Sequence, residues 1–202
     1  DMQASLNAEL IQSWFAELPA LAPPRRLALL GGHPRSGTTL LEQVLDSHPD
    51  IISAEETEIF NFEAYIPLTR PLTLDSPMVA VLTAASREML RQSRNNYFKI
   101  AGKFLNQPIG NRLLIDKNPS LTFLIPLLFR IFPEIKLLIA LRDPRDVVLS
   151  CLMQSMPLGQ GSSVYLTFDS AVNDYGIMMN FWQMLKPVIE GHFFEVRYED
   201  MV

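Results

Sequence analysis

Residues 26–39, RLALLGGHPRSGTT, decide the fold of this chain. The first five residues form a short apolar run that predicts a buried strand, and residues 38–47 have the apolar spacing of a helix. Between the two, Gly32 and Gly37 frame the pattern G-x-x-x-x-G. A loop of this kind between a strand and a helix is typical of sites that surround a phosphate with backbone N–H groups. The alternative is a glycine turn that caps the helix and binds nothing.

The loop departs from ATP-binding loops at one position. Such loops carry a lysine that neutralises the β- and γ-phosphates, followed by a hydroxyl that holds Mg²⁺. Here Thr38 occupies the lysine position, Thr39 follows it, and Arg35 supplies a cation inside the loop. These residues suit a smaller anion than a triphosphate with its metal, such as a phosphate with one attached group.

Short apolar runs alternate with helical patterns along the rest of the chain. The predicted strands are residues 26–30, 51–53, 112–115, 136–141 and 193–198. The predicted helices are residues 4–18, 38–47, 120–132, 144–154 and 168–190, with residues 61–96 mostly helical and 154–168 a loop. This alternation predicts an α/β fold with a parallel sheet that is covered on both faces. Ligands of such sheets bind at the carboxyl ends of the strands.

A second motif, RDPRDVVLS at residues 142–150, follows one of these strands. Asp143 is the expected N-cap of the next helix, and Asp146 is placed to reach back to the N–H of that cap. Arg142 at the strand end and Ser150 two turns along the helix could converge on a second anion. Alternatively, Arg142 pairs with local carboxylates and Ser150 only packs.

Charged residues follow two further strands. Lys117 lies in IDKNP at residues 115–119, where it would point into the same crevice as the loop. The acids Glu55, Glu56 and Glu58 follow the strand at 51–53, and one of them could act as a general base. The alternatives are an ordinary solvated lysine and a solvated acidic helix start.

The composition excludes several classes of protein. Lysine and arginine number 17 and aspartate and glutamate 22, so the formal charge of −5 argues against a general nucleic-acid binder. The 202 residues contain one cysteine, which excludes a disulfide scaffold and favours a reducing compartment, here taken as the cytoplasm. No uncharged apolar run is long enough to span a membrane, and the three histidines have no metal-ligand spacing.

Together the motifs resemble those of sulfotransferases that use 3′-phosphoadenosine 5′-phosphosulfate (PAPS). Within that family the chain is most similar to the tyrosylprotein sulfotransferase-like branch, which includes bacterial proteins that join tetratricopeptide repeats to a sulfotransferase domain. The motifs are PRSGTT at 34–39, EET at 55–57, DKNP at 116–119, RDPRDVVLS at 142–150 and VRYED at 196–200. The resemblance implies a P-loop-like three-layer sandwich, with a parallel sheet of about five strands flanked by helices.

The resemblance also implies a role for individual residues. Those that would hold the 5′-phosphosulfate are Arg35, Ser36, Gly37, Thr38 and Thr39. Arg142 and Ser150 would bind the 3′-phosphate, and Tyr198 would lie on the adenine side. Glu56 would be the general base, while Lys117, together with Arg35, would stabilise the leaving phosphate without a metal.

Three expectations about the whole protein follow from the resemblance. Residues 1–25 form a helical lead-in and residues 26–202 a sulfotransferase domain, which ends before the segment that closes over the nucleotide in the family. Glu58 and Gln154 stand where the tyrosylprotein branch has basic residues, so an acidic peptide acceptor is not expected. The acceptor is otherwise a hydroxyl or amine of unknown class. The competing functions are a P-loop kinase-like nucleotide enzyme and a catalytically inactive nucleotide-binding module.

Overall fold

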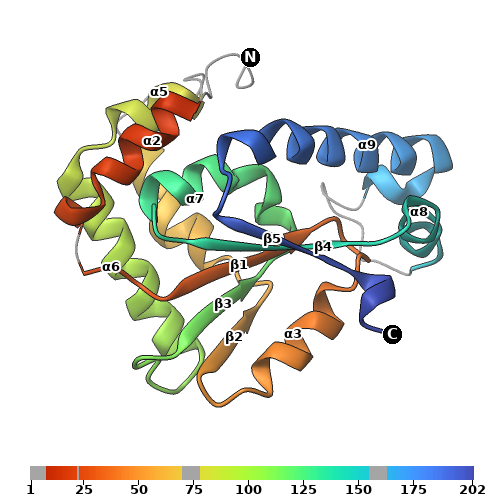
Figure 1. The fold of residues 1–202 in the computed structure, drawn as a ribbon, viewed down its shortest axis with the longest axis horizontal. Coiled ribbons are helices and arrows are strands. Elements are labelled where there is room, and N and C mark those ends of the chain that lie inside the picture. Colours follow the sequence, from red (N-terminus) through yellow and green to blue (C-terminus); the bar gives the residue numbers. More distant parts are fainter. Residues whose placement is uncertain (1–7, 22, 70–77, 155–162) are drawn as a thin grey trace.

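The computed structural model describes residues 8–21, 23–69, 78–154 and 163–202, and it centres on one parallel sheet (Figure 1). The strands are β1 (Leu27–Gly32), β2 (Ile51–Glu55), β3 (Leu113–Lys117), β4 (Lys136–Leu141) and β5 (Phe193–Arg197). They lie in the order β2-β3-β1-β4-β5, and every neighbouring pair is parallel. The expected parallel sheet of about five strands is therefore confirmed.

Helices cover both faces of the sheet. The α-helices are α2 (Ala8–Ala16), α3 (Thr38–Asp46), α4 (Ile66–Thr69), α5 (Met78–Ala84), α6 (Arg87–Phe104), α7 (Ile125–Ile131), α8 (Pro144–Met153) and α9 (Phe168–Leu185). A π-helix spans Phe60–Tyr65, and short 3₁₀ helices span Leu18–Leu21, Pro119–Leu124, Ser163–Leu166, Lys186–Val188 and Tyr198–Asp200. Figure 1 shows α3 on one face of the sheet and α7 and α9 on the other.

The side chains of β1 alternate between two cores, because successive residues of a strand point to opposite faces. Leu27 and Leu29 belong to the larger core, which also contains buried residues of α2, α6, α7 and α9. Ala28 and Leu30 belong to the smaller core, where they pack with Leu41 of α3. The chain is therefore a three-layer α/β sandwich, as the resemblance implied.

Proline explains two differences from the predicted helices. The single helix predicted over residues 120–132 is a 3₁₀ helix followed by α7, which begins at Ile125. Pro126 has no N–H with which to continue the hydrogen-bond pattern of the preceding turn. Similarly, the helix predicted to reach residue 190 ends at Leu185, and the 3₁₀ turn that follows contains Pro187. The predicted loop at 154–168 lies mostly outside the described residues.

Candidate functional site

The topology places the chemistry at the carboxyl edge of the sheet. The central strand β1 has β3 on one side and β4 on the other, so the chain reverses its winding direction there. Ligands of open α/β sheets bind in the crevice at such a switch point. Gly32 ends β1 and opens the predicted anion loop, Lys117 ends β3, and Arg142 follows β4 directly.

Two glycines allow the loop to follow its course. Gly32 has φ +123°, and a Cβ on it would overlap the carbonyl oxygen of Ala140. Gly37 has φ +94°, and a Cβ on it would lie 2.6 Å from Cδ2 of the Tyr198 ring. Both conformations are unfavourable for other residues. The two glycines thus allow β4 and Tyr198 to lie close to the loop.

Buried contacts from below hold the loop in place. The Gly32 N–H donates to the hydroxyl of Thr122 over 3.0 Å. The His33 ring is 1% exposed and lies 3.1 Å from the carboxylate of Asp174 on α9. Ser36 and Thr38 are also buried, while Arg35 and Thr39 are exposed. The loop therefore has a fixed base and one outward-facing cation.

Arg35 lies on the side of the loop where the second predicted motif meets it. Its Nε donates to the Ser150 hydroxyl over 3.1 Å, and its backbone carbonyl lies 3.5 Å from Nη1 of Arg142. The Arg142 guanidinium stacks over the Tyr198 ring, with Cζ 4.4 Å from the ring centroid. The structure thus brings together these four residues, which the resemblance assigned to nucleotide binding.

The Nε of Arg142 is a buried donor with no hydrogen-bond partner among the described residues. A buried unpaired donor is costly, and one on a guanidinium is suited to an anion. The contact of the Arg142 side chain with a carboxylate is long, at 3.5 Å from Nη2 to Asp146. The local-carboxylate alternative therefore leaves this donor unsatisfied.

The capping of α8 differs from the prediction in one respect. Asp143 accepts a hydrogen bond from the N–H of Arg145, as expected of an N-cap. Its own N–H, however, donates over 3.1 Å to Glu199, so the expectation that Asp146 fills this role was wrong. Side-chain and backbone hydrogen bonds from Arg145 lower the pKa of Asp143 to about 2. The Glu199 contact ties the segment that carries Tyr198 to the start of α8.

On the other side of β1, Lys117 is surrounded by carboxylates. Its Nζ lies 2.8 Å from Glu56, 2.9 Å from Glu55 and 3.7 Å from Glu42 of α3. Burial alone would lower the pKa of Lys117, but the hydrogen bonds and charges of these glutamates outweigh it and raise the pKa. Lys117 is therefore a charged, fully buried ammonium. The expectation of a lysine that simply points into the crevice omitted these partners.

Glu56 has the geometry of a positioned but accessible carboxylate. Its side chain is 60% exposed, and its backbone has φ +46°. Its N–H donates to the Lys117 carbonyl over 2.8 Å, which holds this unusual conformation in place. The predicted pair Glu56 and Lys117 is thus brought into direct contact. Glu58 instead accepts a hydrogen bond from Asn61.

Glu42 is the site residue that the sequence did not reveal. It lies one turn into α3, which begins directly after the loop, and it is buried beside Lys117. Burial raises its pKa, while Ser53 and Lys117 lower it. The sequence around Glu42 does not indicate this role, since its partner Lys117 lies on β3, far away in the chain.

Neither a cluster of metal ligands nor a membrane-spanning helix is found in the part of the chain that the structure describes. Among residues 8–21, 23–69, 78–154 and 163–202, no group of three or more His, Cys, Asp or Glu side chains could hold a metal ion. In the same residues, no helix combines the length and apolar character needed to cross a bilayer.

Comparison with known proteins yields one family. The family model described as "Sulfotransferase family" matches residues 28–202. Protein-tyrosine sulfotransferase 1 of Mus musculus is 30% identical over 142 residues, which cover 65% of this chain and 35% of that protein. The nodulation protein NoeE of Sinorhizobium fredii (strain NBRC 101917 / NGR234) is 28% identical over 141 residues, which cover 64% of this chain and 32% of that protein. The chain thus spans about a third of the length of these two relatives.

Solved structures show the same fold. A sulfotransferase domain from the curacin biosynthetic pathway superposes with a TM-score of 0.51 at 22% identity, over 89% of this chain and 69% of that one. A sulfotransferase from Alicyclobacillus acidocaldarius gives a TM-score of 0.53 at 18% identity, over 89% and 75% of the two chains. The sheet order, the loop and the match over residues 28–202 agree, and the chain belongs to the sulfotransferase family.

Proposed function

We propose that this chain carries the donor-binding and base residues of a PAPS-dependent sulfotransferase, which acts on an acceptor hydroxyl or amine. One observation carries the donor assignment. The Nε of Arg142 is buried beside the loop and has no hydrogen-bond partner in the described part of the chain, while the rest of the guanidinium contacts the Arg35 carbonyl and the Tyr198 ring. This combination provides an anion partner next to an aromatic surface.

The donor's two phosphates fit two groups of residues. The loop, residues 35–39, would hold the 5′-phosphosulfate with its backbone N–H groups and with Arg35. Arg142 and Ser150 would hold the 3′-phosphate, and Tyr198 would flank the adenine. When bound, PAPS would supply the electrophilic sulfuryl group that the acceptor attacks. The match of the family model to residues 28–202 supports the assignment of residues 26–202 to this domain, with residues 1–25 as its helical lead-in.

Glu56 is suited to remove the acceptor's proton. Its carboxylate is exposed enough to meet an acceptor, and one of its oxygens accepts a hydrogen bond from Lys117 over 2.8 Å. This bond orients the carboxylate, whose oxygens can accept a proton. A proton leaving the acceptor oxygen or nitrogen would therefore pass to a Glu56 carboxylate oxygen.

Lys117 and Arg35 are suited to stabilise the phosphate that leaves. The Lys117 ammonium lies at the end of the strand beside β1, and its Nζ donates to Glu55 and Glu56, so stabilising the phosphate would require one of these hydrogen bonds to be exchanged for one to the phosphate. Such an exchange would supply from β3 the counter-charge that an ATP-binding loop takes from its own lysine. Thr38 stands where an ATP-binding loop has its lysine, and Lys117 supplies a cation from β3 instead. Both features support a donor that carries a single 5′-phosphate.

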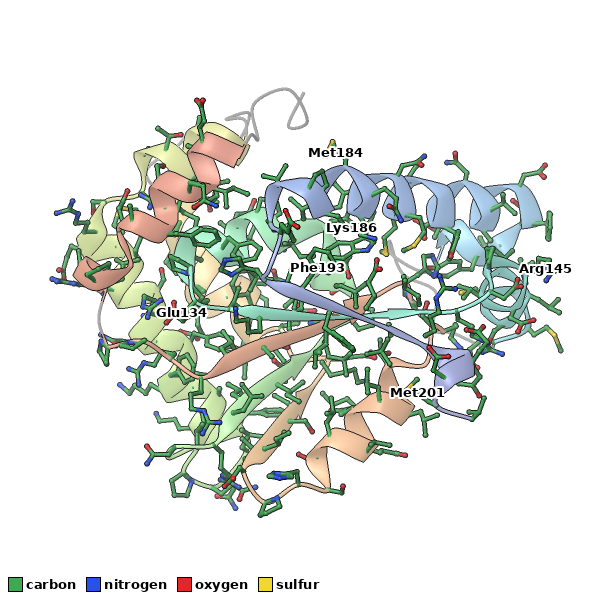
Figure 2. The ribbon with its side chains drawn as sticks, viewed as in Figure 1. Glu134, Arg145, Met184, Lys186, Phe193 and Met201 are labelled. Atoms are coloured by element: carbon green, nitrogen blue, oxygen red, sulfur yellow. The ribbon has the colours of Figure 1, made fainter. Side chains whose placement is uncertain are left out.

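The donor assignment is tested by removing one guanidinium. Arg142→Ala should weaken adenosine 3′,5′-bisphosphate by about 10- to 100-fold, the range for a lost charge-assisted hydrogen bond. Adenosine 5′-phosphate, which lacks the 3′-phosphate, should lose much less. Arg145→Ala is the matched control, because its side chain is 88% exposed and points away from the sheet (Figure 2). Equal losses for the two nucleotides, measured by calorimetry, would contradict the role of Arg142.

The base assignment has its own test. Glu56→Gln should leave bisphosphate affinity within about twofold and abolish sulfuryl transfer to any acceptor in a panel of phenols, sugars and amines. Glu58→Gln is the control, since its carboxylate contacts Asn61 rather than Lys117. Transfer by the Glu56 variant at the rate of the unmodified protein would remove Glu56 as the base.

A further inference from the structure

We propose that His33 is a positioning residue of the loop, held as an imidazolium between the Pro34 carbonyl and Asp174. In this state it would keep the loop in its binding conformation, so that affinity for the donor falls as His33 loses its proton. The ligand in this inference rests on the proposed function. The charge state of His33 rests on the geometry alone.

Both ring nitrogens of His33 have an oxygen within hydrogen-bond distance. Nδ1 lies 2.8 Å from the carbonyl oxygen of Pro34, the next residue of the loop. Nε2 lies 3.1 Å from Oδ2 of Asp174, which belongs to α9 and is 141 residues away in sequence. The ring is 1% exposed, so water does not replace either partner.

These two contacts decide the protonation state. A carbonyl oxygen can only accept a hydrogen bond, and an ionised carboxylate can also only accept. A neutral imidazole has one N–H, so one of its nitrogens would then present a lone pair to an oxygen lone pair. An imidazolium has two N–H groups and satisfies both partners, and the Asp174 charge balances its own.

Among the residues that the structure describes, the other titratable side chains packed around the pair are Tyr165, Cys151 and Tyr175. The Tyr165 hydroxyl also donates to Asp174, over 3.1 Å, and burial together with Asp174 raises its pKa. Burial raises the pKa of the Cys151 thiol, which lies 3.8 Å from the Pro34 carbonyl, to about 11. Burial likewise raises the pKa of Tyr175, whose ring lies 5.2 Å from His33.

Arg35, two residues further along the loop, carries the permanent positive charge of a guanidinium. At low pH the imidazolium donates both hydrogen bonds, and its positive charge lies beneath an anion-binding loop. As the pH rises through the range in which histidines titrate, one bond and the charge are lost. Affinity for an anionic ligand should therefore fall with rising pH.

The binding test compares ratios of dissociation constants, because the phosphates of the ligand also titrate near pH 6 in every sample. Calorimetry with adenosine 3′,5′-bisphosphate and EDTA is run at about pH 6 and about pH 8.5. His33→Gln and Asp174→Asn should bind about tenfold more weakly than the unmodified protein at the lower pH, and within about twofold of it at the higher pH. His48→Gln, an exposed histidine outside the site, should match the unmodified protein at both.

A constant loss at both pH values would show a merely structural role for His33 and would overturn the proposal. A second measurement does not depend on the ligand. In the protein with ¹⁵N-labelled histidine, the His33 signals, identified by their absence in His33→Gln, should show two protonated ring nitrogens at about pH 6. A neutral tautomer at about pH 6 would overturn the charged contact with Asp174.

The two measurements separate the two proposals. Failure of the bisphosphate to bind at any pH would refute the donor assignment and, with it, the role of His33 in donor binding. The nuclear magnetic resonance result would still decide whether His33 is an imidazolium. Binding without the pH-dependent difference between His33→Gln and the unmodified protein would leave the donor assignment intact and refute only the positioning role.

Discussion

Gly37→Ala tests whether the loop at residues 32–39 and Tyr198 form one unit. Gly37 has φ +94°, and an added Cβ would lie 2.6 Å from Cδ2 of Tyr198. The left-handed backbone costs a residue with a Cβ about 1–2 kcal/mol. Relief of the clash requires Tyr198 to move off the Arg142 guanidinium, which forfeits a cation–π contact of about 0.5–2 kcal/mol. The total loss should therefore be about 1.5–4 kcal/mol.

Thermal unfolding measures this loss. For a chain of this size the midpoint should fall by roughly 5–15 °C. Gly102→Ala is the matched control, because an added Cβ there meets nothing within 4 Å and Gly102 lies inside α6. That substitution should stabilise the protein by up to about 1 kcal/mol through helix propensity.

A double substitution separates the two contributions. In a Tyr198→Ala background, Gly37→Ala should cost only the backbone term of about 1–2 kcal/mol, because the ring is no longer there to be displaced. An unchanged midpoint for Gly37→Ala alone would refute the account of the glycine. The same loss in both backgrounds would refute the contact with Tyr198.

Arg94→Ala should lower the free energy of unfolding by about 3–5 kcal/mol, because it removes a buried guanidinium that pairs with Glu134 and donates to the Ile131 carbonyl, whereas exposed Arg91→Ala should cost at most about 1 kcal/mol; equal losses in urea unfolding would contradict this. Burial raises the pKa of Asp116 to about 7, so the folded state keeps this proton at pH values where the unfolded state has lost it. The free energy of unfolding should therefore fall as the pH rises from about 4 to about 7, by up to about 1.4 kcal/mol per pH unit. Asp116→Asn should remove that slope in thermal unfolding, and an unchanged slope would exclude Asp116 as its source. Thr122→Val leaves the Gly32 N–H without its buried acceptor and should cost about 1–3 kcal/mol by the same measurement, with no loss contradicting the anchor.

The sequence predicts those parts of the fold that depend on neighbouring residues. The five strands are short apolar runs, and the helix that starts at Thr38 directly follows a glycine-rich loop. Asp143 caps α8 because a short acceptor followed by proline defines a helix start locally. The parallel orientation of the strands then follows from the helices that connect successive strands.

The contacts that the sequence does not predict join residues that are far apart in the chain. Asp143 and Glu199 are 56 residues apart, so the nearby Asp146 was the natural but wrong candidate for that contact. The burial of Lys117 beside Glu42 depends on how α3 packs over β3, which no local pattern encodes. A buried side chain stays charged only beside such partners, and only the tertiary structure identifies them.

The central claim is a metal-independent site for a nucleotide with a 3′-phosphate and a single 5′-phosphate. Calorimetry with this protein in EDTA tests it most directly, with adenosine 3′,5′-bisphosphate in one titration and ATP with excess Mg²⁺, without EDTA, in another. The account predicts binding of the bisphosphate in EDTA that is at least about tenfold tighter than binding of Mg²⁺–ATP. Tighter binding of Mg²⁺–ATP, or no binding of the bisphosphate, would contradict it.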